Sequence, residues 1–192
     1  MNTYFKAPAM PIACEHPESH QHESELVYSD FLKTLIVFIK NLSGHHGMWR
    51  EHLKLVNALN EVVHLFYMPE MHSNLVPILV DFLYKGNQEL QDASCLCFAK
   101  ILKFQHQTES RKELLYIIRK EMYSSRNWIK RKAFLVFCKH TIKLQSRKFF
   151  ETNFMKDFLN CSKDRIAQIR MEFVEAMLII KPYFDKKKVL AN

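Results

Sequence analysis

Glycine is scarce in this chain, since only 3 of the 192 residues are glycine. Glycine supplies the positive-φ positions that tight β-hairpins and phosphate-cradling loops require. A β-sandwich, a dinucleotide-binding fold and a P-loop enzyme are therefore all disfavoured. Because 48% of the residues are hydrophobic and 25% are charged, the composition is that of an ordinary globular protein, and a helical one is the remaining class.

Amphipathic helices account for most of the chain. Apolar residues recur at spacings of three and four in eight successive stretches, which places each set on one face of an α-helix. Short polar or proline-containing breaks separate the stretches, so no sequence is left over for a sheet. The pattern predicts an all-α fold, with helices over approximately 31–42, 53–66, 75–83, 90–104, 114–122, 128–144, 150–159 and 166–180.

Three short polar residues mark expected helix starts. Asn74, Asn127 and Asp164 each stand just before an apolar stretch, where the side chain can accept free N–H groups of the first turn. Pro77 is expected in the first turns of the third helix, because a proline there costs no helical hydrogen bond.

The ends of the chain differ from the helical part. Residues 1–25 contain three of the 6 prolines and three of the 10 histidines without apolar periodicity, so we expect a disordered tail. Three lysines in succession, Lys186 to Lys188, stand near the carboxyl end. The predicted organisation is a tail over 1–25, a helical array over 26–184 and a charged end over 185–192.

A regular period, about 40 residues long, links the helices in pairs. Four polar or basic residues follow an apolar one near the start of an even-numbered helix, at nearly equal intervals along the chain: Arg50, Gln91, Lys130 and Arg170. Such a period, with two antiparallel helices per unit, is typical of HEAT and armadillo solenoids. The sequence therefore predicts a HEAT/ARM-type α-solenoid of about four antiparallel helix pairs, and a non-repetitive helical bundle is the alternative.

Two segments resemble a known family. Asp164-Arg165-Ile166-Ala167-Gln168-Ile169-Arg170 is the better copy of a turn followed by a second helix, and the segment from Ser125 to Phe134 is the other. Both resemble the HEAT unit of the scaffold and regulatory subunits of phosphatase 2A- and phosphatase 4-type serine/threonine phosphatases. The similarity covers residues 48–184, most of the chain.

The resemblance implies a non-catalytic scaffold whose successive turns form a ridge that binds the phosphatase catalytic subunit. Trp and Arg are the residue types that most often dominate binding at protein interfaces. Another protein partner, including a peptide in the concave groove of the array, remains open. The resemblance places partner-binding residues at Asn127, Trp128, Lys130, Arg131, Asp164, Arg165, Gln168 and Arg170.

The sequence shows no catalytic, cofactor or metal motif. It lacks G-x-S-x-G, H-E-x-x-H, P-loop and C-x-x-C patterns. His16, His20 and His22 have a spacing that a metal ion could use, but no thiolate or carboxylate geometry is fixed around them. His52 and His64 stand more than three helical turns apart, too far to share one ion. We expect no enzyme activity, no cofactor and no bound metal.

The cysteines and the apolar runs predict where in the cell the protein is located. The five cysteines are odd in number and follow no repeating spacing, so we expect small buried thiols in a reducing compartment. The purely apolar runs, such as residues 35–39, are far shorter than the roughly 20 residues that span a bilayer. The expected location is the cytoplasm or the nucleus, with no membrane partner.

Positive charge is concentrated in the carboxyl-terminal part. Residues 1–110 carry 8 Lys/Arg against 12 Asp/Glu, whereas residues 111–192 carry 20 against 8. A basic region attracts acidic protein, nucleic acid or an anionic membrane surface. Nucleic-acid binding is therefore the alternative function, through clusters whose affinity would fall steeply with salt: Lys130-Arg131-Lys132, Arg147-Lys148 and Lys186-Lys187-Lys188.

Overall fold

The computed structural model describes residues 48–65, 68–85 and 87–184, together with isolated residues between 30 and 41. The expected tail over 1–25, the charged end over 185–192 and most of the first helical stretch lie outside the described residues. In the part that is described, all regular structure is helical and no strand occurs, which confirms the all-α prediction.

Eight α-helices and four short helical turns follow one another in the described ranges. The α-helices are α2 (Trp49–Val62), α3 (Met68–Lys85), α4 (Gln88–Phe104), α5 (Thr108–Ile117), α6 (Trp128–Leu144), α7 (Arg147–Asn153), α8 (Met155–Asn160) and α9 (Ala167–Ile180). The short turns are the 3-10 segments η1 (Val63–Leu65), η3 (Cys161–Lys163) and η4 (Lys181–Tyr183), and the π-helical turn η2 (Ile118–Tyr123).

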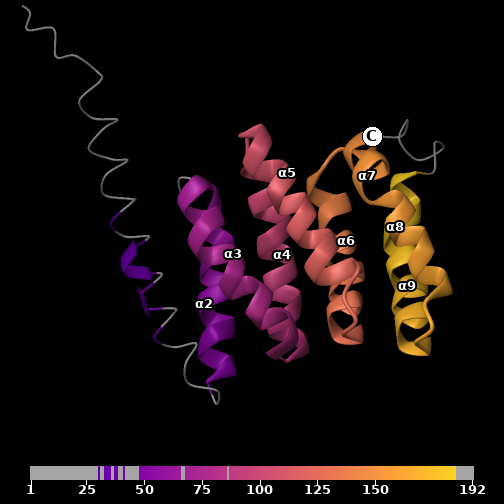
Figure 1. Cartoon of the computed structure of the whole chain (residues 1–192), viewed down its shortest axis with the longest axis horizontal. Coiled ribbons are helices and arrows are strands. Elements are labelled where there is room, and N and C mark those ends of the chain that lie inside the picture. The colour runs from indigo at the N-terminus through magenta and orange to yellow at the C-terminus, as the bar shows by residue number, and fades with distance from the viewer. Residues whose placement is uncertain are drawn as a thin grey trace, which may run out of the picture.

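One series of helices forms the central row of the molecule. α2 packs against α4, α4 against α6, and α6 against α9. The intervening helices flank this row, with α3 against α4 and η2, which continues α5, against α6. In Figure 1 the helices of this row, α2, α4, α6 and α9, follow one another from left to right. The members of the row begin at nearly equal intervals along the chain, at Trp49, Gln88, Trp128 and Ala167.

Side-chain caps explain where two helices of the row begin. The Asn127 side chain accepts the N–H of Ile129 at 2.9 Å, which confirms its predicted role as the N-cap of α6. Asn87 caps α4 in the same way by accepting the N–H of Leu90. These caps satisfy N–H groups that have no partner within the helix.

Three expectations about helix starts are wrong. Asn74 and Pro77 lie inside α3, which begins at Met68, because Pro69 occupies the first turn of that helix and does not end the preceding one. Asp164 is not the N-cap of α9, since Ile166 holds that position. The Asp164 carboxylate instead accepts the N–H of Ile166 at 2.9 Å, within the turn.

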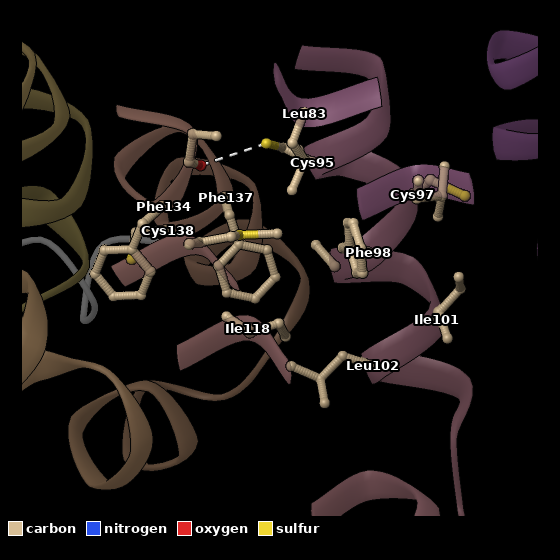
Figure 2. Close-up of a cluster of buried hydrophobic side chains, with 14 of the residues drawn as sticks. Leu83, Cys95, Cys97, Phe98, Ile101, Leu102, Ile118, Phe134, Phe137 and Cys138 are labelled. Carbon is tan, nitrogen blue, oxygen red and sulfur yellow. Dashed lines mark hydrogen bonds between the residues drawn. The ribbon is translucent and has the colours of Figure 1, made fainter. Parts of the chain in front are cut away.

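The core runs along the whole row of helices and is rich in phenylalanine. Figure 2 shows its middle part, where α4, η2 and α6 meet around Phe98, Phe134 and Phe137, all of which are fully buried. The Cys95 thiol donates a hydrogen bond to the carbonyl of Ala133 across the helix interface, at 3.3 Å. Since neither α4 nor α6 could hide these side chains alone, the packing of neighbouring helices is what excludes water.

The described cysteines are free and buried, as expected: Cys95, Cys97, Cys138 and Cys161. Burial raises the pKa of Cys97 and of Cys161 to about 12, so these thiols stay protonated and unreactive at neutral pH. No described helix is both long enough and apolar enough to cross a bilayer.

Candidate protein-interaction edge

The turns that precede α6 and α9 lie on the same edge of the molecule, at the bottom in Figure 1. We call residues 124–128 and 163–168 the turn edge. Most of these residues are exposed, and Trp128 keeps 43% of its surface accessible. An exposed tryptophan in a structured turn can anchor a binding partner at little cost in conformational entropy.

Arg131 ties the two turns together. Its guanidinium donates to both carboxylate oxygens of Asp164, from Nε at 2.8 Å and from Nη2 at 3.1 Å. Its third nitrogen, Nη1, donates to the backbone carbonyls of Ser125 and Arg126, each at 3.0 Å. A bidentate pair of this kind is stronger and more directional than a single hydrogen bond. One side chain therefore fixes the first turn and joins it to the second.

Arg170 repeats part of this arrangement one unit further along. Its Nη1 donates to the carbonyls of Asp164 and Arg165, at 2.8 and 3.2 Å. These carbonyls stand six and five residues before Arg170, as those of Ser125 and Arg126 do before Arg131. Arg131 and not Lys130 is therefore the counterpart of Arg170, because each of the two arginines holds the fourth position of its helix.

The eight residues assigned from the sequence fall into two groups. Lys130, Arg131 and Asp164 form ion pairs inside the protein. Lys130 pairs with Glu121 at 2.8 Å, and Arg131 pairs with Asp164. The others are exposed, although Asn127 also caps α6 and Arg170 also holds the turn: Asn127, Trp128, Arg165, Gln168 and Arg170. The same two turns also expose Arg126 and Lys163, which the sequence reasoning did not assign to the candidate site. Their position in the same two turns is the signal that could have found them.

The turn edge is electrically positive. Asp164 is the sole carboxylate in its sequence, against Arg126, Lys163 and Arg165. The hydrogen bond from Arg131 holds the pKa of Asp164 below its ordinary value, against the opposing effect of burial. The Asp164 charge is thus permanent at neutral pH and is balanced mainly by Arg131, with a smaller attraction to Arg165, so the turns keep a net positive charge.

The lowered pKa of Asp164 predicts a pH dependence. A folded-state pKa below the unfolded value, about 3.9, stabilises the fold above that pH, and the contribution is lost as the pH falls through the folded-state pKa. We expect the difference in Tm between wild type and Asp164→Asn to be largest near neutral pH and to shrink below about pH 4. Glu109→Gln, which alters an exposed pair with Lys112, is the control and should change Tm little. A difference independent of pH would contradict the prediction.

Two of the hollows in the described part lie near the turns or between helices of the central row. A small one of about 250 Å³ lies between the turns and is lined by Ser124, Asn160 and the Arg131–Asp164 pair, among others. A larger groove of about 720 Å³ crosses α2, α4, α6 and α9. In this groove Glu172 is 6% exposed and binds Lys139 at 2.6 Å, with Lys132 at 3.7 Å.

Two of the described histidines contact side chains of other helices. His52 stacks on Phe82 with ring centroids 4.9 Å apart, and His140 lies 3.1 Å from the carboxylate of Asp92. In the described ranges, no three His, Cys, Asp or Glu side chains converge in a way that could hold a metal ion. The turn edge could recognise a partner through its cations, through the Trp128 ring and through the polar groups of the turns.

Comparison of the chain with protein-family models, with curated proteins and with solved structures finds no significant match in any of the three.

Proposed function

We propose that the chain is a non-catalytic protein-interaction scaffold of the HEAT type that binds its partner through the turn edge. The observation that carries the proposal is a set of hydrogen bonds made by Arg131, Asp164 and Arg170. The Arg131–Asp164 pair joins two successive exposed turns, and Arg170 holds the second turn through the Asp164 carbonyl. A surface that is already ordered loses little entropy on binding. The nearly equal intervals between the starts of α2, α4, α6 and α9 support the HEAT-type assignment.

The first partner to test is a phosphatase 2A- or 4-type catalytic subunit, on the basis of the resemblance of residues 48–184. The turn edge offers what a protein interface needs, namely an accessible tryptophan beside arginines. Arg131, Arg170 and Asp164 support these contacts from within the chain, so we assign the partner contacts to Arg126, Trp128 and Arg165.

Ion pairs within the chain weigh against the alternative of nucleic-acid binding. Of the cluster Lys130-Arg131-Lys132, each member lies within 4 Å of a carboxylate of its own chain. Arg119 and Arg147 likewise pair with Asp157 and Glu151. Because these cations already have carboxylate partners, they are less available to phosphates than the sequence alone suggests.

A binding assay with the purified catalytic subunit tests the proposal. We expect the variant Arg126→Ala/Trp128→Ala/Arg165→Ala to bind at least about tenfold more weakly than wild type, because it removes an exposed aromatic and two arginines from one surface. The matched control Tyr116→Ala/Lys143→Ala/Lys148→Ala removes one aromatic and two cations that are exposed elsewhere. Equal binding by the two variants, or no binding by wild type, would contradict the proposal.

A further inference from the structure

At the turn edge, the exposed cations differ from the buried ones in whether they pair with a carboxylate. Arg126, Lys163 and Arg165 are exposed, and none of the three forms a salt bridge within 4 Å to a described residue, although Arg165 attracts Asp164 at longer range. One step further in, Lys130 and Arg131 are 14% and 12% exposed, and each is bound to a carboxylate. The inner cations hold the fold together, whereas the outer ones present positive charge to solvent.

The backbone that carries two of the outer cations is fixed. The carbonyl of Arg126 accepts a hydrogen bond from Arg131, and the carbonyl of Arg165 accepts one from Arg170. The Arg131–Asp164 pair joins the two turns. Arg126 and Arg165 each stand two residues before the first residue of their helix, and α6 packs against α9. We therefore take their spacing to be that of packed helices, about 8–10 Å.

This spacing suits an extended peptide. A peptide in the extended conformation advances about 3.3 Å per residue, so side chains about three residues apart span the gap between neighbouring turns. The hollow between the turns is lined by Ser124, Ser125 and Asn160, which can receive a small polar side chain. Trp128 adds an apolar contact surface in the same edge.

We propose that the turn edge binds an acidic, extended segment of a partner protein, in which two carboxylates about three residues apart reach Arg126 and Arg165. The inference rests on the proposed function and names the chemistry of its partner. Complementary charge across an interface speeds association and rejects partners of the wrong sign. A protein segment is favoured over a nucleic acid because Trp128 is the sole aromatic residue in the two turns, whereas single-strand binding uses several stacked rings.

Fluorescence anisotropy with a labelled, unstructured peptide that contains the core Glu-Leu-Ser-Glu tests the inference. We expect wild type to bind it, and to bind the same peptide with Gln in place of Glu at least about tenfold more weakly. The double reversal Arg126→Glu/Arg165→Glu should lower affinity by a similar factor. The matched reversal Lys143→Glu/Lys148→Glu makes the same change in net charge on exposed residues outside the turn edge and should have an effect of about twofold or less. Thermal melts of both variants check that the fold is retained.

Three results would overturn the inference: equal binding of the Glu and Gln peptides, including no binding of either, equal losses in the two double reversals, or binding of a single-stranded RNA through Arg126 and Arg165 in preference to the peptide. The proposed function has a separate test in the assay with the catalytic subunit. If that assay depends on Trp128 while the acidic peptide fails to bind, the scaffold function stands and the acidic segment is rejected.

Discussion

Phe154→Ala is expected to lower the free energy of unfolding by about 3–5 kcal/mol, a large share of the 5–15 kcal/mol that stabilises a typical domain. Phe154 is completely buried, and its ring centroid lies 5.3 Å from that of Phe137 and 6.0 Å from those of Phe149 and Phe150. Removing the ring leaves a cavity between α6 and the segment of α7 and α8. Urea unfolding followed by circular dichroism measures the loss.

Tyr116→Ala is the matched control for this prediction. Tyr116 is also aromatic, but it is 61% exposed, so its removal should change stability by no more than about 0.5 kcal/mol. If Phe154→Ala cost less than about 1 kcal/mol, the packing of the α6, α7 and α8 segments would differ from the one described.

The helices could be predicted from the sequence where polar breaks and periodicity agree. The stretch expected over 128–144 is observed as Trp128–Leu144, because Asn127 gives that helix a definite start. The break at Phe154 was not predicted, since Phe150, Phe154 and Phe158 keep a helical spacing on one face. The backbone departs from helical angles at Phe154, with φ −129° and ψ −21°, which no side-chain pattern reveals.

The position of the candidate site could be predicted from the sequence, but the ion pairs within it could not. The sequence placed polar and aromatic residues of the turns together, and the structure does bring residues 124–128 and 163–168 to one edge. Which cation pairs with which carboxylate depends on the register within one helix. Neighbouring residues differ by about 100° around the helix axis, so Lys130 reaches Glu121 while Arg131 reaches Asp164. The HEAT-type solenoid and the phosphatase partner stay predictions.

Glu172→Gln is expected to lower the free energy of unfolding by about 3 kcal/mol, the lower end of the range for breaking a buried ion pair. Glu172 on α9 is 6% exposed, and its partners on α6, Lys132 and Lys139, are 16% and 19% exposed. A neutral glutamine cannot balance two ammonium groups that remain partly dehydrated. Urea unfolding measures the loss, and hydrogen exchange should show faster opening of α9. The control Lys112→Ala breaks an exposed pair with Glu109 and should cost at most about 1 kcal/mol.

Replacing all three charges separates the effect of unbalanced charge from that of packing. The variant Lys132→Met/Lys139→Met/Glu172→Met leaves no buried charge without a partner, so it should recover most of the stability lost in Glu172→Gln. A triple variant as unstable as the single one would contradict the role of charge balance. Because Glu172 joins α9 to α6, its loss should also loosen residues 163–168 relative to residues 124–128. Affinity for the acidic peptide should therefore fall in Glu172→Gln and return in the triple variant, although none of these side chains belongs to the turn edge.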